Sequence, residues 1–208
     1  MKIIITESQY KLLLEATEGL DEFLETLKNE LKLSDELIDE VKSIFEKTDC
    51  KKVSFENLSG PMGLALHNKL VINSIVLDTK YMSIYGRNAI TQTLFIIFHE
   101  LAHQYQFKKY GEEKMMGLYL NEIPLDEAAE SMAKYEAVAD EFAIRKVREL
   151  QQKKLLPMDV KARKGYGNYP SPQIFKGMLE KIRTELTRSG VDNIDKAAEY
   201  IYNMVKPR

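Results

Sequence analysis

The chain has 208 residues, of which 44% are hydrophobic and 30% are charged, and its formal net charge is −2 at pH 7. This length and composition suit a single hydrophobic core, and the balanced charge excludes the overall basic surface that is typical of nucleic-acid-binding proteins. The single cysteine, Cys50, excludes an intramolecular disulfide and fits a reducing compartment, where we expect a structural thiol.

The N-terminal residues lack the features of a signal peptide. The apolar run Ile3, Ile4, Ile5 is interrupted at Thr6, and no stretch of about eighteen apolar residues occurs anywhere in the chain. We therefore expect no membrane partner and a cytoplasmic location. This opening resembles the first residues of proteins encoded by tailed bacteriophages, which implies the host cytoplasm or the virion as the location.

The first 50 residues are predicted to be mainly helical. A short strand is expected at residues 2–5, followed by a helix that Thr6 opens. Two amphipathic helices are expected at about 20–32 and 35–47, the second with Ser34 as its N-cap. We expect these helices to pack as a bundle that supports the domain; the alternative is a surface that binds a partner.

A small sheet is predicted next. Residues 51–56 alternate between polar and apolar side chains, as in a half-buried strand, and the Gly- and Pro-rich residues 58–63 form a turn. Residues 69–78 are rich in Val and Ile and predict one strand, or two strands with a break near Asn73 and Ser74.

Two long helices follow the predicted sheet. The first is expected at about 88–110, ending before Gly111, and the second runs from just after Pro124 to about Gln151. On the first of these helices, His99 and His103 share a face with apolar residues such as Phe95 and Ile96, whereas Lys108 points the opposite way, which predicts that the histidines lie on its buried side.

The C-terminal part is predicted to be a loop followed by helices. Residues 153–173 contain Pro, Gly and several basic residues, and we expect a solvated loop or lid there. Two closing helices are expected at about 173–188 and 192–205, with Gly190 between them.

These elements predict a mostly helical α+β fold in a single domain, 1–208. Within this domain we distinguish an N-terminal helical segment at 1–50, a core at 51–152, and a loop with C-terminal helices at 153–208. The sequence contains no internal repeat and no linker that would divide it.

The sequence His99-Glu100-Leu101-Ala102-His103 matches the HExxH pattern within the first long helix. Two histidines four residues apart project from one face of a helix, at the spacing that a tetrahedral zinc ion needs. Glu100 lies between them, close enough to act on a metal-bound water without being a ligand. The sequence therefore predicts one zinc ion per chain, with His99 and His103 as ligands and Glu100 as the general base.

A site of this kind needs a third protein ligand. The remaining histidine, His67, lies upstream near a predicted strand and is the weaker candidate. The second long helix places Glu136 and Asp140, one turn apart, within an alanine-rich apolar face. Burying two carboxylates is costly unless a cation or strong donors receive them. We therefore predict Glu136 as the third ligand and Asp140 as the acceptor for a ligand histidine; the alternatives are a buried ion pair with an Arg or Lys elsewhere, or a helix face that meets solvent.

The HELAH sequence, followed on a later helix by Glu-Ala-x-Ala-Asp-x-Phe-Ala, resembles zinc metallopeptidases of the gluzincin type and, among these, the ImmA/IrrE-type peptidases. The likeness covers roughly residues 60–150. SprT-like proteases also place a strand before HExxH, but they resemble this chain less, because no third-ligand histidine follows downstream.

The resemblance implies a zincin-like core that hydrolyses peptide bonds. In such enzymes the zinc lowers the pKa of a bound water, and the residue corresponding to Glu100 takes its proton and passes it to the leaving amine. The edge strand of the small sheet pairs with an extended peptide. A second donor stabilises the oxyanion beside the metal, and its candidates here are His67, Tyr166 and Tyr169.

The sequence thus favours a zinc metalloendopeptidase that acts on a peptide or protein substrate. The main alternative is a non-catalytic structural or regulatory protein, such as a phage virion or assembly component, that retains the same fold. Glu100 argues against it, because a purely structural zinc has no use for a general base. A DNA-linked regulator is disfavoured by the near-neutral charge and the absence of a clear helix-turn-helix, so no nucleic-acid partner is expected. The oligomeric state stays open.

Overall fold

The computed structural model describes residues 18–48, 50–83, 88–158 and 171–207. Over these residues the fold is α+β and mostly helical, with one three-stranded sheet, as the sequence predicts. The strand expected at residues 2–5 and the helix expected to start at Thr6 lie outside the described residues.

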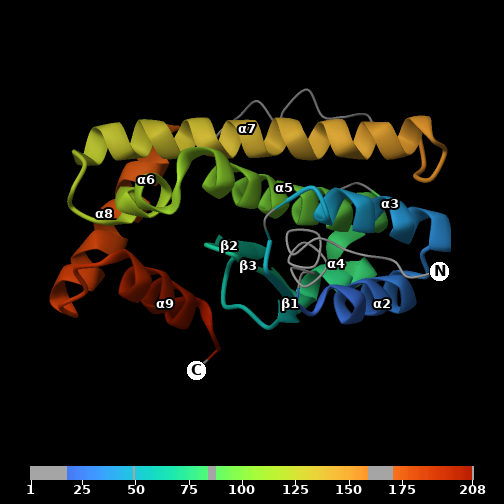
Figure 1. The fold of residues 1–208 in the computed structure, drawn as a ribbon, viewed down its shortest axis with the longest axis horizontal. Helices are drawn as coiled ribbons and strands as arrows, with labels where there is room; N and C mark the ends of the chain where they lie inside the picture. The colour runs from blue at the N-terminus through green and yellow to red at the C-terminus, as the bar shows by residue number, and fades with distance from the viewer. Residues whose placement is uncertain (1–17, 49, 84–87, 159–170, 208) are drawn as a thin grey trace, which may run out of the picture.

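Two long helices form the centre of the molecule. Helix α5 (Ala89–Tyr110) lies between helix α7 (Leu125–Gln152) on one side and the sheet on the other (Figure 1). Most of the residues in the first half of α5 are buried, because protein surrounds this helix on several sides.

The ends of both helices confirm the boundaries that the sequence predicts. The side chain of Asn88 accepts a hydrogen bond from a backbone N–H in the first turn of α5, and Gly111, with a φ of 84°, follows its last residue. Helix α7 begins directly after Pro124. Ala139 and Ala143 are fully buried on α7, and such small side chains allow neighbouring helices to approach closely.

The sheet comprises β1 (Lys52–Glu56), β2 (Gly63–Leu66) and β3 (Lys69–Asn73) in the order β1-β3-β2. Strand β3 is central; it pairs in parallel with β1 and antiparallel with β2. The sequence predicts β1 and β3, but not β2, which has only four residues and follows a Gly- and Pro-rich turn. Strand β2 packs against α5 and so lies beside the HExxH motif.

Asn73 is the last residue of β3, and its side chain forms hydrogen bonds both with the loop before β2 and with the turn that follows β3. Its side-chain oxygen accepts a hydrogen bond from the backbone of Ile75 (3.2 Å), while its Nδ2 donates to the carbonyl oxygens of Leu58 (2.9 Å) and Pro61 (2.8 Å). The chain therefore breaks where the sequence places a possible break, and a 3₁₀ turn (Ser74–Leu77) replaces the second strand.

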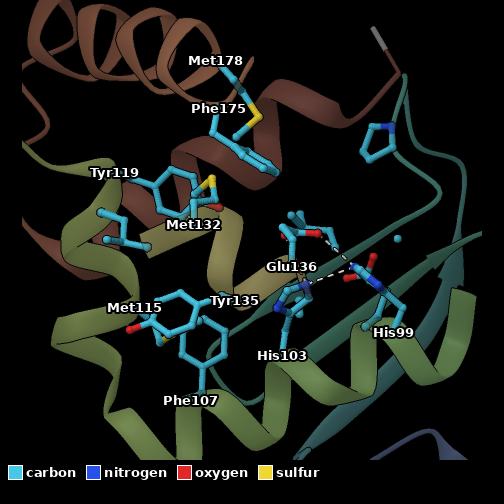
Figure 2. Close-up of a pocket in the computed structure, with 16 residues that line it drawn as sticks. His99, His103, Phe107, Met115, Tyr119, Met132, Tyr135, Glu136, Phe175 and Met178 are labelled. Carbon is cyan, nitrogen blue, oxygen red and sulfur yellow. Dashed lines mark hydrogen bonds and ion pairs between the residues drawn. The ribbon is translucent and has the colours of Figure 1, made fainter. Parts of the chain in front are cut away.

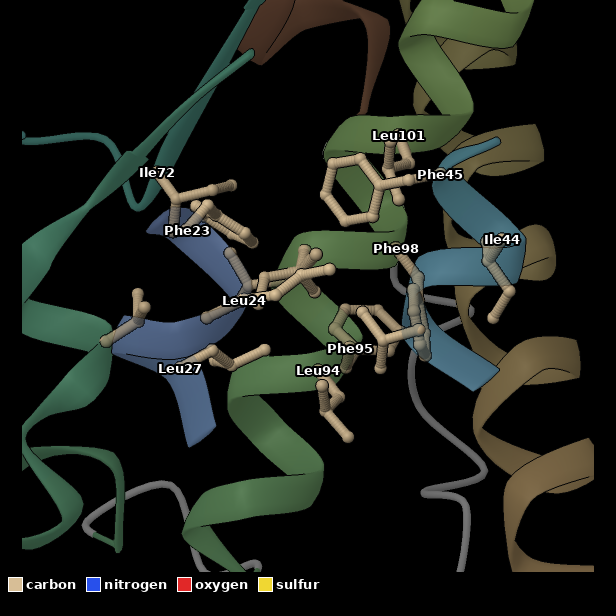
Figure 3. Packing of buried hydrophobic residues seen from close by; sticks show 14 of the residues in the cluster. Phe23, Leu24, Leu27, Ile44, Phe45, Ile72, Leu94, Phe95, Phe98 and Leu101 are labelled. Carbon is tan, nitrogen blue, oxygen red and sulfur yellow. The ribbon is translucent and has the colours of Figure 1, made fainter. Parts of the chain in front are cut away.

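Helices α2 (Leu20–Leu31) and α3 (Asp35–Phe45) complete the larger core and confirm the two amphipathic helices predicted for this region. The hydroxyl of Ser34 caps α3, as expected. Figure 3 shows apolar side chains of α2 and α3 in one core with residues of α5 and with Ile72 of β3. Residues that meet in this core include Phe23, Leu27, Phe45, Ile72, Phe98 and Leu101. Cys50 is buried, and its burial raises the pKa of the thiol to about 11.

The other end of the molecule is built from shorter elements and the C-terminal helices. Helix α6 (Glu112–Met116) and the 3₁₀ turn η2 (Gly117–Tyr119) connect α5 to α7. Helix α8 (Pro172–Arg188) packs on α7, and α9 (Ile194–Val205) packs on α6. The sequence predicts α8 and α9 but not α6, η2 or the five-residue helix α4 (Thr79–Ser83). No helix in the described ranges is long and apolar enough to cross a membrane.

Candidate metal centre

The packing of α5 against α7 brings together the three predicted metal ligands. The Nε2 atoms of His99 and His103 lie 3.2 Å apart, and the carboxylate of Glu136 lies 3.1 Å from the first and 3.4 Å from the second (Figure 2). Ligand atoms at about 2.0–2.1 Å from a tetrahedral zinc ion are separated by about 3.3 Å. The contact with His99 is made by Oε2 of Glu136 and the contact with His103 by Oε1, and one ligand atom from each of the three residues lies within 4.8 Å of the other two. The three side chains are therefore close enough together to share one metal ion.

The other ring nitrogen of each histidine is held by an acceptor. Asp140 Oδ1 lies 2.8 Å from His99 Nδ1, and a carboxylate can only accept, so Nδ1 of His99 donates. Gln106 Oε1 lies 2.9 Å from His103 Nδ1, while Gln106 Nε2 donates to the carbonyl of Tyr135 (2.8 Å). The amide oxygen of Gln106 thus faces His103, whose Nδ1 must also donate. In the neutral form, both Nε2 atoms then present free lone pairs toward Glu136.

The electrostatics of this cluster favour a cation. Burial alone would lower the pKa of His99, but hydrogen bonds to the carboxylates of Asp140 and Glu136 raise it to about 10. Burial would raise the pKa of Glu136, but its hydrogen bonds with His103 and His99 hold it well below its usual range. The raised pKa of His99 means that a proton supplies positive charge between the histidines and the carboxylates when no ion is bound, and a divalent cation at the same place would take over that role.

Glu100 points to the sheet side of α5 and touches strand β2. A β-carbon added at Gly63 would lie 2.5 Å from Cγ of Glu100, so this strand position accommodates the glutamate only because it is glycine. Burial raises the pKa of the Glu100 carboxyl, while the charges of His99 and His103 and a backbone hydrogen bond with Ala65 act in the opposite direction. A raised pKa makes the Glu100 carboxylate a stronger proton acceptor, as a general base requires.

A pocket of about 320 Å³ opens over the metal ligands. Its polar floor consists of His99, Glu100, His103 and Glu136. The rest of its wall contains β2 residues, two tyrosines, and a group of apolar side chains from α5, α6, η2, α7 and α8, which we call the apolar recess: Phe107, Met115, Leu118, Met132, Phe175 and Met178.

Tyr119 is a site residue that the sequence does not indicate. It lines the pocket from η2, on the side away from α5 (Figure 2). Burial raises the pKa of its hydroxyl, and the nearby carboxylates of Glu136 and Glu100 raise it further, so the hydroxyl keeps its proton and can donate a hydrogen bond. The chain has 11 tyrosines, and no spacing pattern distinguishes this one.

Of the three residues that the sequence offers as oxyanion donors, only His67 lies within the described residues, and it is outside this pocket. His67 lies in the turn between β2 and β3, where Nδ1 is 3.5 Å from a carboxylate oxygen of Glu112 and the ring packs edge-on against Phe107. It is not one of the residues that line the pocket. Tyr166 and Tyr169 lie outside the described residues.

The predicted residues His99, Glu100, His103, Glu136 and Asp140 thus lie together at one site, and the alternative of a buried Arg or Lys partner for Glu136 and Asp140 has no support among the described residues. Sequence reasoning missed Tyr119 and the role of Gln106. Gln106 follows His103 by three residues on the same helical face, and this spacing was a signal for a contact with that histidine.

Comparisons with protein-family models, with curated proteins and with solved structures gave no match. The argument for function therefore rests on the geometry and chemistry of this site.

Proposed function

We propose that this protein is a zinc-dependent metallopeptidase with a zincin-like core. The observation that carries the proposal is the cluster of His99, His103 and Glu136, whose ligand atoms lie within 4.8 Å of one another, with both histidine Nδ1 atoms held by acceptors. Glu100 lies beside this cluster, and its carboxylate is not one of the three ligands. This combination favours a catalytic site, because a structural zinc would be closed by a fourth protein ligand.

The residues have separate roles in the proposed reaction. A zinc ion held by His99, His103 and Glu136 supplies a Lewis acid for the scissile carbonyl and lowers the pKa of a water. Glu100 accepts a proton as the water oxygen bonds to the carbonyl carbon, and delivers it to the amine when the C–N bond breaks. The protonated hydroxyl of Tyr119 is our candidate donor to the oxyanion.

Strand β2 is the proposed binding edge for the substrate backbone. It is one of the two outer strands of the described sheet, and its residues Gly63, Leu64 and Ala65 line the pocket. An extended peptide that pairs with this edge would pass over the polar floor of the pocket.

Metal analysis of the purified protein tests the ligand assignment. We expect about one zinc ion per chain, and a large loss of zinc in a Glu136→Ala variant, because two histidines alone hold the ion weakly. Glu130→Ala is the matched control, since Glu130 is exposed on the same helix and should leave the zinc content unchanged. A wild-type protein without affinity for zinc would refute the proposal.

A Glu100→Gln variant tests catalysis separately from metal binding. This variant should bind zinc normally and lose hydrolysis by a factor of about 10² to 10⁴, because a general base contributes this much. Cleavage is measured with a library of internally quenched peptides and by mass spectrometry of the products. Zinc binding without cleavage of any peptide would favour the non-catalytic alternative.

A further inference from the structure

The apolar recess begins at the metal ligands and extends away from them toward α8. Figure 2 shows Phe175, Met178, Met132 and Tyr119 grouped on the side of the pocket opposite His99. Apart from the four residues of the polar floor, no described residue that lines the pocket carries a charged side chain. A charged group that entered the recess would therefore lose its hydration without gaining a partner.

The wall of the recess is rigid on its inner side. Leu118, Met132 and Phe175 are buried and belong to one hydrophobic cluster with the fully buried Leu179 of α8. Phe107 and Met115 belong to a neighbouring cluster formed with α9. The recess is therefore formed before a ligand binds, so no part of the binding free energy is needed to create it.

The pocket is large enough for one large side chain of a bound peptide and the backbone atoms of that residue. Its volume is about 320 Å³, whereas an apolar cavity of about 150 Å³ is sufficient for benzene. Met178, which is 40% exposed, lies at the rim, and its flexible side chain can adjust to different apolar shapes.

We propose that the recess binds a bulky apolar side chain, such as Leu, Met or Phe, at a substrate position that flanks the scissile bond. Helix α8 then sets the specificity of the enzyme, although it contributes nothing to the metal centre. This inference rests on the proposed peptidase function, and the experiments below separate the failure of one from the failure of the other.

Quenched peptides that differ at a single position test the preference directly. Two series of peptides contain a fixed glycine. In the first series the residue before this glycine is Gly, Leu, Phe, Asp or Lys, and in the second series the residue after it is varied in the same way. For each peptide, kcat/KM is measured with the zinc-loaded protein. In one series, the Leu and Phe peptides should exceed the Gly peptide by about 10- to 100-fold, because burial of such side chains is worth this factor. Asp and Lys peptides should be no better than Gly. Equal rates for all five residues in both series would refute the inference and leave the peptidase function intact.

A substitution at the rim tests the role of α8. Met178→Lys should lower kcat/KM for the Leu peptide by about 3- to 10-fold and increase the relative rate of the Asp peptide, because the new ammonium group lies at the mouth of the recess. The matched control is Ile174→Lys, one helical turn earlier: Ile174 is 62% exposed and does not line the pocket. A change in specificity of equal size in both variants would refute the assignment to the recess.

Binding provides a test that does not require turnover. The hydroxamates of Gly, Leu, Phe and Asp can chelate the zinc while their side chains reach toward the recess, and their affinity for the zinc-loaded Glu100→Gln variant is measured by calorimetry. Tighter binding of Leu and Phe than of Gly, by about tenfold or more, supports the inference even if no peptide is cleaved. Equal affinities would refute it, whatever the result for hydrolysis.

Discussion

At the scale of single residues, the candidate site depends on the second hydrogen bond of each histidine. Asp140 and Gln106 hold the two Nδ1–H groups and thereby direct both Nε2 lone pairs to one point. Gln106 also binds the backbone carbonyl of the residue that precedes Glu136. One buried glutamine thus orients His103 on α5 and fixes the position of the turn on α7 that carries Glu136, and both of these residues are candidate ligands.

Gly63 provides a residue-scale prediction. A Gly63→Ala variant should still bind zinc, because the three ligands are untouched, but its methyl group would displace Glu100. We expect the rate of peptide cleavage to fall by about 10- to 100-fold, as expected for a catalytic group displaced by about 1 Å. Zinc content and kcat are measured on the same preparation, and an unchanged kcat would contradict the prediction.

The control for this substitution is Gly177→Ala on α8. A β-carbon at Gly177 meets no atom within 4 Å, and the residue is helical. This variant should retain full activity and gain up to about 1 kcal/mol in the free energy of unfolding, because alanine is the better helix former.

At the scale of elements, the connector between α5 and α7 (residues 111–124) is held in place by hydrogen bonds from α8. Nε and Nη2 of the buried Arg183 donate to the carbonyl of Leu118 (3.3 and 2.9 Å), and Nη1 donates to the carbonyl of Ile123 (2.9 Å). The connector carries Leu118 and Tyr119 into the pocket. A single guanidinium group therefore holds the wall of the site onto a helix that is distant from it in the sequence.

An Arg183→Lys variant tests this fastening. A lysine cannot donate to both carbonyls in the same planar geometry, and a buried carbonyl that loses its donor costs about 1–3 kcal/mol. We expect a loss of this size in the free energy of unfolding, measured with urea. Arg188→Lys serves as the control, because the Arg188 side chain is 71% exposed and its ion pair with Glu185 should contribute less than about 1 kcal/mol. Equal effects of the two substitutions would contradict the role of Arg183.

At the scale of the whole molecule, α9 closes against the edge of the sheet near β1. The hydroxyl of Tyr202 donates to the carboxylate of Glu56, which also accepts from Ser54 (2.9 Å) and lies 3.3 Å from the ammonium of Lys69. The backbone N–H of Ser59 donates to the carbonyl of Val205 at the end of α9 (2.6 Å). The C-terminal helix is thus joined to the strand farthest from the pocket.

This junction predicts a pH dependence of stability. Burial would raise the pKa of Glu56, but the hydrogen bonds from Tyr202, Ser54 and Lys69 lower it. A carboxyl with a lowered pKa in the folded state stabilises the fold above its unfolded pKa of about 4.5, and this contribution is lost as the pH falls through the folded value.

A Glu56→Gln variant should therefore be less stable than the wild type by about 1–2 kcal/mol at pH 7, and this difference should become smaller as the pH falls. Urea unfolding at pH 7 and at about pH 3 measures the difference. Glu199→Gln, an exposed position on α9, is the control and should show no such dependence. A difference that persists unchanged in acid would contradict the assignment.

The sequence by itself determined the long helices, two of the three strands and five residues of the candidate site. These features depend on local patterns: the cap at Ser34, the break at Asn73, and the HExxH spacing are each contained within a few residues. The interruption of an apolar helical face by Glu136 and Asp140 was also visible, because helical geometry relates positions along one element.

Only the tertiary structure decided the rest of the site. Strand β2 is short and is stabilised by its pairing with β3, so its four residues carry no strand signal of their own. The position of Tyr119 follows from the packing of η2 on α8, and the apolar recess combines side chains from five elements. Such features arise from contacts between residues far apart in the chain, for which no local spacing rule exists. For this reason the sequence predicted the residues of the candidate metal centre but not the pocket around them.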